Sequence, residues 1–454
     1  MENKNDQMLR GPLLPAVIRY TVPIILTSVL QLLFNAADLI VVGRSSAEFG
    51  SHYVAAVGTT GSLTSLLVNL FIGVSVGVGV TVAQGLGAKN SETVHRAVHT
   101  ALPAALVGSV ALTALGVIFC ETFLRWMGTP ADVLPLSAVY MRIYFGGITF
   151  NLVYNFSAAI LRAAGDTKRP LLYLIIAGVI NVILNLIFVT VFHMNVDGVA
   201  LATTISQGIS AVLVVRALMR RNDECKLVLR KMRFYKQELL KSIGIGLPAG
   251  LQTSLFSISN VLIQSSINAF DTVVMAGNAA AANIEAFLYV SMNAFHQTAL
   301  NFTGQNVGAG NYRRVRQVLL TCLGCVAVLG TVVGVGCFSM APNLLSLYIP
   351  GAEESIHWGV VRMSYIFSFY ALCGIMDVTT GSLRGMGVSL TPMLISVFGV
   401  CGIRIGWIMT FFRLEQFHTP QSLYMSYPVS WLLTFLGQII LFYFAYRRRT
   451  RKLQ

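Results

Sequence analysis

The chain has 454 residues, of which 55% are hydrophobic and only 11% are charged. Soluble globular proteins carry about 25% charged residues, so this composition excludes an ordinary soluble enzyme and predicts an integral membrane protein. The formal net charge of +14 does not indicate nucleic-acid binding, because the basic residues lie in short connections between apolar runs. Since about 20 apolar residues cross a bilayer, the length allows about twelve spans and no sizeable soluble domain.

The apolar runs, bounded by Gly, Pro and charge clusters, predict about twelve transmembrane helices. The chain begins with a polar segment that lacks the features of a cleaved secretory signal, so insertion is expected to start with the first span. The predicted spans are 15–41, 54–83, 96–120, 134–160, 170–192, 197–219, 239–267, 275–302, 316–339, 357–382, 390–412 and 425–446.

The basic residues predict the orientation of the chain. If the N-terminus is cytoplasmic, the inside connections hold most of the Lys and Arg, above all in the segment 220–237 and in the C-terminal tail. The outside connections hold little beyond Arg44, Arg125 and Arg413. The positive-inside rule therefore places both termini in the cytoplasm, and the basic loops make anionic membrane lipid an expected partner.

Three motifs recur in the same order at nearly one offset, which predicts an internal repeat. The displacements are 221, 222 and 225 residues: VAQGLGAKN at 82–90 recurs as TGQNVGAGN at 303–311, LRAAGDT at 161–167 as LRGMGVS at 383–389, and Pro23 as Pro248. Each repeat contains six spans, an even number, so both repeats enter the membrane from the same side. A pseudo-two-fold axis along the membrane normal should relate them.

The repeat divides the chain into an N-terminal six-helix lobe at 1–219, a basic cytoplasmic linker at 220–237 and a C-terminal six-helix lobe at 238–454. The predicted fold class is an all-α integral membrane protein of two related six-helix bundles. In such proteins the substrate site is expected between the halves near the middle of the membrane, and one half rocks against the other.

The first span carries a polar stripe on one helical face: Thr27, Gln31, Asn35 and Asp38, at spacings of 4, 4 and 3. A carboxylate inside an apolar span is costly, so Asp38 is a functional candidate, and the stripe should face the protein interior or water. Pro23, fifteen residues before Asp38, predicts a hinge, because proline removes a backbone hydrogen bond. The alternative is that Asp38 only joins two helices by a hydrogen bond.

Two later spans offer partners for Asp38. Asn181 and Asn185 lie four residues apart on the fifth span, and Thr203 lies on the sixth. These groups could surround Asp38 with oxygen ligands for Na⁺, a hard cation. Alternatively Asp38 could take up a proton, and the asparagines could simply form interhelical hydrogen bonds.

The second half does not repeat this carboxylate. At the offset of 225, Asn35 corresponds to Asn260 in a stripe that also includes Ser257, but Asp38 corresponds to Ile263. The seventh span therefore has a polar face without an acid.

The second half carries its own acids, Glu285 in the eighth span and Asp377 in the tenth. At the offset of 222, Asp377 corresponds to Asn155. Glu285 and His296 are eleven residues apart, on nearly the same helical face, and could form a second proton- or cation-responsive site. Alternatively, His296 is a buried neutral imidazole with a satisfied hydrogen bond.

Two further observations concern basic residues and catalytic motifs. Arg142 and Arg362 nearly match across the repeat and are interpreted as snorkelling anchors. The sequence contains no HExxH, GxxxxGK[ST] or GxSxG motif, so we expect neither ATP hydrolysis nor another enzyme activity. An ion gradient is the expected source of energy.

Together these residues resemble the MATE (multidrug and toxic compound extrusion) transporters over nearly the whole chain. The resemblance rests on Pro23 with Asp38, the Asn181/Asn185 pair and the segments VAQGLGAKN, LRAAGDTKRP, GVALATTISQ, GLPAGLQTS, TGQNVGAGN and LRGMG. It implies export of mostly cationic, amphipathic compounds in exchange for H⁺ or Na⁺, without a cofactor.

The resemblance also implies a cation site in the first half. The family builds it from a first-span Asp, two polar fifth-span residues and a sixth-span Thr, which match Asp38, Asn181, Asn185 and Thr203. Some branches have Asp where this chain has Asn185, and others carry a seventh-span Glu where this chain has Phe256 and Ser257. Asp377 does not align cleanly with the tenth-span Asp of that second branch. These departures favour coupling around Asp38.

A lipid or lipid-linked saccharide flippase of a related fold is the main alternative. It would need a cationic groove, and the clearly intramembrane basic residues are only Arg142, Arg362 and Arg404. A membrane enzyme acting on lipid would need interfacial catalytic groups, which the short loops do not provide. We expect a monomer in the bacterial cytoplasmic (inner) membrane that acts on a small organic substrate and binds no nucleic acid.

Overall fold

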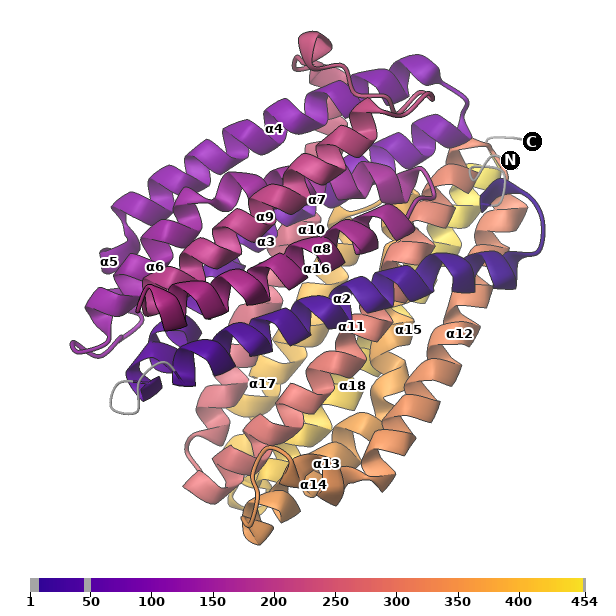
Figure 1. The fold of residues 1–454 in the computed structure, drawn as a ribbon. Coiled ribbons are helices and arrows are strands. Elements are labelled where there is room, and N and C mark those ends of the chain that lie inside the picture. The colour runs from indigo at the N-terminus through magenta and orange to yellow at the C-terminus, as the bar shows by residue number, and fades with distance from the viewer. Residues whose placement is uncertain (1–7, 45–49, 452–454) are drawn as a thin grey trace. The chain divides into compact units, whose positions relative to one another are not determined.

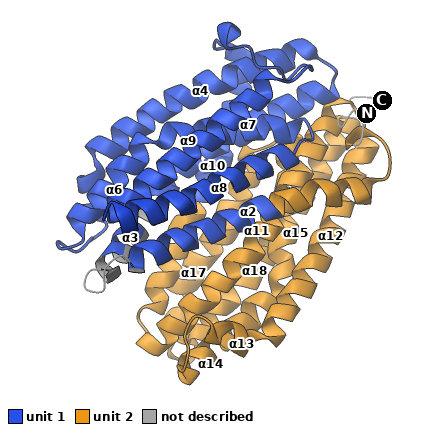
Figure 2. Ribbon diagram, in the orientation of Figure 1, with its two compact units in different colours: residues 1–5, 26–254 blue, residues 6–25, 255–454 orange. Residues whose placement is uncertain are grey.

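The computed structural model describes residues 8–44 and 50–451, and this part of the chain is helical, without a strand (Figure 1). The described residues form two compact units (Figure 2). Unit 1 contains residues 26–44 and 50–254, and unit 2 contains residues 8–25 and 255–451. The predicted all-α fold is confirmed.

Unit 1 consists of seven complete helices and parts of two longer ones. Its complete helices are α3 (Gly50–Gly87), α4 (Ser91–Ile118), α5 (Cys120–Trp126), α6 (Leu134–Gly146), α7 (Ile148–Ala163), α8 (Lys168–Leu186), which continues as the π-helix η1 (Ile187–Val191), and α9 (Val196–Met219). The two shared helices are α2 (Leu13–Arg44) and α10 (Lys236–Ile267).

Unit 2 holds the remaining helices of the second half. They are α11 (Thr272–Gly308), α12 (Tyr312–Ser339), α13 (Ala341–Ser346), α14 (Glu353–Ile366), α15 (Tyr370–Gly385), α16 (Leu390–Ser396), the π-helix η4 (Val397–Gly402), α17 (Ile403–Met409) and α18 (Pro420–Thr450). Short 3₁₀ turns lie at Phe367–Phe369, Phe411–Arg413 and Glu415–Phe417 in unit 2, and a further one lies at Leu229–Lys231 in unit 1.

The boundary between the units falls inside α2 and α10, shortly after Pro23 and Pro248, and both prolines lie within continuous helices. Residues 8–25 pack with unit 2 and residues 238–254 with unit 1. The lobes at 1–219 and 238–454 follow the sequence repeat and stay a prediction, as does the hinge at Pro23.

The number of spans differs from the predicted twelve. Among the described residues, 10 helices are long and apolar enough to cross a membrane, or 11 if α6 and α7, bent by 46°, form one span. The remaining predicted span, 239–267, corresponds to α10, which has 32 residues but is not among those helices. Its polar residues, which include Asn260, make it less apolar than the others.

The repeated loop motifs are helix caps. Lys89 and Gly310 adopt positive φ values of 53° and 70°, and the asparagine that follows each of them caps the next helix. Asn90 Oδ1 accepts from Thr93 N at 3.0 Å, and Asn311 Oδ1 accepts from Arg314 N at 3.2 Å. An asparagine side chain at this position satisfies a free amide of the first helical turn. The motifs therefore recur because both halves stop and restart a helix in the same way.

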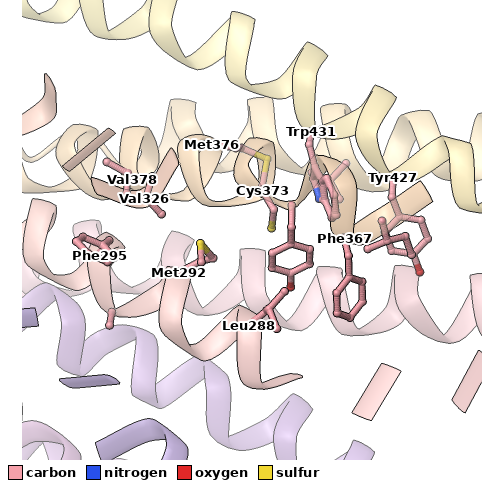
Figure 3. Packing of buried hydrophobic residues seen from close by; sticks show 14 of the residues in the cluster. Leu288, Met292, Phe295, Val326, Phe367, Cys373, Met376, Val378, Tyr427 and Trp431 are labelled. Carbon is pink, nitrogen blue, oxygen red and sulfur yellow. The ribbon is translucent and has the colours of Figure 1, made fainter. Parts of the chain in front are cut away.

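The core of unit 2 is built around α11. Its Leu288, Met292 and Phe295 belong to one buried apolar cluster with Phe367 and Trp431 (Figure 3). Trp431 also meets the Tyr370 ring edge-to-face, with ring centroids 5.6 Å apart. Side chains from α11, α15 and α18 thus hold the unit together.

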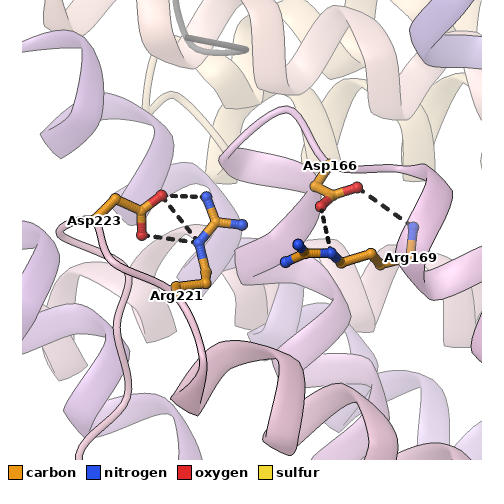
Figure 4. A network of polar contacts seen from close by, with 4 residues as sticks. All are labelled: Asp166, Arg169, Arg221 and Asp223. Carbon is orange, nitrogen blue, oxygen red and sulfur yellow. Dashed lines mark hydrogen bonds and ion pairs between the residues drawn. The ribbon is translucent and has the colours of Figure 1, made fainter. Parts of the chain in front are cut away.

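The segment after α9 is anchored to unit 1 by polar contacts. Val228 N donates to His99 Nε2 at 3.0 Å on α4, and Arg221 Nε donates to Asp223 Oδ1 at 2.8 Å. Burial opposes ionisation of Asp223, but the hydrogen bonds and charge of Arg221 outweigh it and lower the pKa of that carboxyl. Figure 4 shows this ion pair beside that of Asp166 and Arg169.

In unit 1, α3 and the first part of α10 touch through glycines. A Cβ on Gly73 would lie 2.3 Å from Gly250 N, and one on Gly77 would lie 1.9 Å from Ser242 O. Small residues let membrane helices approach at backbone distance.

Gly77→Ala should lower the melting temperature of the detergent-purified protein, because the new methyl group meets backbone that cannot move aside. Overpacking of this kind costs about 1–3 kcal/mol. Gly244→Ala on α10 is the matched control, since a Cβ there meets nothing within 4 Å. Equal melting temperatures for the two variants would contradict the close approach.

Candidate functional site

Asp38, Asn181, Asn185 and Thr203, predicted from the sequence, come together in unit 1. Asn185 Nδ2 donates to Asp38 Oδ1 at 2.5 Å, and Thr203 Oγ1 donates to Asp38 Oδ2 at 3.2 Å. Asn181 completes the ring: its Oδ1 accepts from Asn185 Nδ2 and its Nδ2 donates to Thr203 Oγ1, both at 3.3 Å. One carboxylate thus has three neutral polar neighbours from two other helices.

Local sequence explains this geometry. Asn181 and Asn185 lie one turn apart, so both side chains leave the same face of α8. A Cβ on Gly178, one turn earlier, would lie 1.9 Å from the ring of Phe34, so glycine leaves room on α8 for this side chain of α2. The π-helix η1 starts just after Asn185, and π-helical turns often occur at functional sites. Gly178 and Phe34 are positioning residues that the sequence alone did not single out.

The oxygen atoms around Asp38 suit a hard monovalent cation. Asn185 Oδ1 is buried and has no hydrogen-bond partner among the described residues. The same part of the chain contains no group of three His, Cys, Asp or Glu side chains that could hold a metal ion. Na⁺ would therefore rely on the Asp38 carboxylate together with amide and hydroxyl oxygens.

The other candidates of the first half do not join this cluster through the hydrogen bonds described above. Gln31 and Asn35 are exposed on α2. Asn155 Nδ2 donates within α7, to Asn151 O at 2.9 Å and to Asn151 Oδ1 at 3.1 Å. The structure thus separates Asp38, which is buried, from the exposed part of its stripe.

In unit 2, Glu285 forms an ion pair with Arg362, whose Nη2 lies 2.5 Å from Glu285 Oε2. Arg362 Nη1 also donates to Asn278 O at 2.8 Å, and Arg362 is only 5% exposed. The prediction of a snorkelling anchor is therefore wrong for Arg362, because a carboxylate and a carbonyl inside the unit compensate its charge. Arg142 differs: its half-exposed side chain pairs with Glu121 at 2.7 Å.

His296 and Asp377 are both buried and belong to a different network. His296 Nδ1 lies 2.7 Å from Asp377 O, and His296 Nε2 lies 3.5 Å from Arg384 Nη1. A carbonyl only accepts and a guanidinium only donates, so the contacts assign a neutral imidazole with its proton on Nδ1. These contacts do not connect His296 to Glu285. Asp377 Oδ2 is buried without a hydrogen-bond partner among the described residues.

The polar face of α10 contacts a third buried arginine. Asn260 is exposed, and its Oδ1 accepts from Arg404 Nη1 at 3.4 Å, while Ser257 is half-buried one turn earlier. Asn260 was predicted from the polar stripe, whereas Arg404 was noted only as an intramembrane basic residue.

The MatE family model matches the chain twice, at residues 23–187 and 248–408. The two matches begin 225 residues apart, the offset of Pro23 and Pro248, as an internal repeat requires.

Among relatives, "Probable multidrug resistance protein YoeA" of Bacillus subtilis is 28% identical over 394 residues, which cover 85% of this chain and 84% of that protein. "FAD transporter" of Shewanella oneidensis is 26% identical, covering 86% of each chain. The chain is also similar to a solved structure titled "Crystal structure of MATE in complex with MaL6", with a TM-score of 0.91, 20% identity and coverage of 99% and 100%. At this identity, the structural likeness shows the fold.

Glu285→Gln should strongly destabilise the protein, because Arg362 then keeps a buried charge without its carboxylate. Breaking a buried ion pair from one side costs about 3–5 kcal/mol. The double variant Glu285→Gln/Arg362→Met should recover part of this loss, measured as the melting temperature of the purified protein. If the double variant melts no higher than the single variant, the pair does not stabilise the unit as described.

Proposed function

The chain belongs to the MatE family, and from this we propose that it is a secondary active antiporter that exports organic, mostly cationic amphipathic compounds in exchange for H⁺ or Na⁺. The observation that carries the proposal is the buried Asp38 with its neutral ring of Asn181, Asn185 and Thr203. The relatives whose names describe multidrug resistance or multidrug export support the substrate class. The protein moves its substrate and does not convert it chemically.

The surroundings of Asp38 make it responsive to ions. A buried charge is costly unless it is compensated, and the partners described above for Asp38 are amides and a hydroxyl, none of them cationic. A bound proton or Na⁺ would supply the missing compensation.

Ion binding would also change the contact between helices. The Asp38 carboxylate accepts from Asn185 on α8 and from Thr203 on α9. Protonation turns one of its oxygens into a donor, and a bound Na⁺ competes for both oxygens. Either event alters how α2 is held by α8 and α9, and Pro23 is our candidate for the hinge that lets α2 respond by bending.

The flippase alternative has less support. Arg142 and Arg362 are both paired with carboxylates, Glu121 and Glu285 respectively. This pairing removes two of the three basic residues that a cationic groove for a pyrophosphate would use.

We further propose a monomer in the bacterial cytoplasmic membrane with both termini in the cytoplasm, as the distribution of Lys and Arg predicts.

Asp38→Asn should abolish ion-driven transport of an organic cation in proteoliposomes, because an amide neither takes up a proton nor neutralises Na⁺. Asp271→Asn is the matched control, since Asp271 is exposed at the start of α11 and its side chain forms no capping hydrogen bond. Ion-driven transport by Asp38→Asn at the wild-type rate would refute coupling through Asp38.

The coupling ion can be identified by imposing a pH gradient and a Na⁺ gradient separately on wild-type proteoliposomes loaded with a cationic dye. One gradient should drive dye movement, and Asn185→Ala should weaken it, because Asn185 contacts the carboxylate directly. If neither gradient moves any dye, the antiporter proposal fails.

A further inference from the structure

Unit 2 buries three arginines, and they differ in how their charges are compensated. Arg362, Arg384 and Arg404 are 5%, 6% and 4% exposed. Arg362 pairs with Glu285, and Arg384 contacts His296 beside Asp377. Within residues 8–44 and 50–451, no carboxylate forms an ion pair with Arg404.

Among the described residues, the hydrogen bonds and ring contacts of Arg404 are all with neutral groups. Its Nε donates to Ser430 Oγ at 3.1 Å and its Nη1 to Asn260 Oδ1 at 3.4 Å. Its guanidinium carbon lies 4.0 Å from the centre of the Tyr427 ring and 5.9 Å from that of Trp431. Ring faces attract a cation, but they do not replace a counterion in a low-dielectric interior.

The Arg404 cluster draws on the helices of the second half that correspond to those of the Asp38 cluster, although Asp38 itself corresponds to Ile263. At the offset of 225, Asn260 corresponds to Asn35, one turn from Asp38. At the offset of 222, Asn181 corresponds to Ile403, the residue immediately before Arg404.

The third helix of each cluster is also equivalent, since α9 and α18 are the last helices of the two halves. Thr203 contributes a hydroxyl from α9, and Ser430 contributes one from α18. The two halves therefore place polar clusters on corresponding helices but with opposite charge, a carboxylate in unit 1 and a guanidinium in unit 2.

A guanidinium binds carboxylate and phosphate oxygens through paired, charge-assisted hydrogen bonds. Arg404 Nη1 contacts Asn260, whose side chain is exposed on the polar face of α10. A polar helix face in a membrane protein borders water or protein rather than lipid. An anionic group that approaches this face meets the exposed Asn260 first, and the buried Arg404 guanidinium lies directly behind it, next to two aromatic rings.

We propose that Arg404, with Asn260 and Ser430, binds the anionic group of an organic substrate, a carboxylate or a phosphate attached to an aromatic body. This inference rests on the proposed export of organic compounds and adds the residue that would bind an acidic group of the substrate. Tyr427 and Trp431 hold the guanidinium in place from the protein side.

Two dyes with the same cationic ring system test the proposal: rhodamine B, which has a free carboxylate, and its ethyl ester, which has none. Their affinities are measured by fluorescence polarisation on full-length protein in nanodiscs of zwitterionic lipid, with empty nanodiscs as background. The readout is the ratio of acid affinity to ester affinity. Arg404→Gln should lower this ratio about tenfold, as expected for the loss of a charge-assisted contact.

The matched control is Arg142→Gln. Arg142 is a half-exposed arginine of unit 1, so its substitution should leave the ratio of acid affinity to ester affinity unchanged. Arg404→Lys should keep part of the preference, since it retains the charge without the paired geometry. Asn260→Asp gives an independent test if Arg404→Gln does not fold. The new carboxylate would form an ion pair with the Arg404 guanidinium, compete with the substrate anion and so also lower the ratio.

Other sources of the anion give different results. Full competition by inorganic phosphate with an unchanged acid-to-ester ratio in Arg404→Gln would overturn the proposal in favour of a free ion. A ratio that depends on anionic lipid in the nanodisc, but not on Arg404, would overturn it in favour of a lipid headgroup. No ion gradient is used, so a failure of coupling through Asp38 leaves this measurement unaffected.

Discussion

An ionised side chain in the hydrocarbon region must be compensated by the protein itself, because no bulk water is available there. The buried charges of this chain meet that constraint in two ways. Glu285 and Arg362 neutralise each other, so their pair holds helices together and needs no further ion. Asp38 and Arg404 have only neutral partners among the contacts described, and for this reason we propose that each accepts a charge from outside the protein. We therefore assign the proposed ion coupling to Asp38 and the proposed binding of a substrate anion to Arg404.

The repeat surrounds these two charges with corresponding helices, although Asp38 lies on the first helix of its half and Arg404 on the fifth. Each lies where the first, fifth and sixth helices of its half meet, and a hydroxyl from the sixth helix contacts it. A duplicated scaffold with one acidic and one basic cluster could couple to an inorganic cation in one half and recognise a substrate anion in the other. This proposed division would account for loop motifs that recur and buried charges that do not.

The likeness of the halves has a local cause at the helix ends. Asn90 and Asn311 cap equivalent helices after residues in the left-handed region, and Gly165 and Gly387, at φ values of 78° and 81°, follow equivalent helices α7 and α15. Caps depend on a few neighbouring residues, so they are conspicuous in the sequence. The caps set where the helices begin and end. They do not constrain the polar residues along each helix, so these residues can differ between the two halves.

Several features of the protein could be read from the sequence because they depend on local patterns. Composition and hydropathy gave the membrane class, repeated caps gave the internal repeat, and helical spacing put Asn181 and Asn185 on one face. A buried carboxylate is unusual enough to single out Asp38 by itself.

Long-range packing decided the rest. Whether Arg362 reaches the interface or a carboxylate, and whether Glu285 meets His296 or Arg362, depends on neighbouring helices that no local pattern specifies. Among the described residues, the count of apolar spans also departed from twelve, because polar residues along α10 make it less apolar than the other long helices. The sequence determined the fold class and singled out Asp38. Only the tertiary structure showed that no carboxylate among the described residues pairs with Arg404, because compensation of a charge depends on neighbours in space.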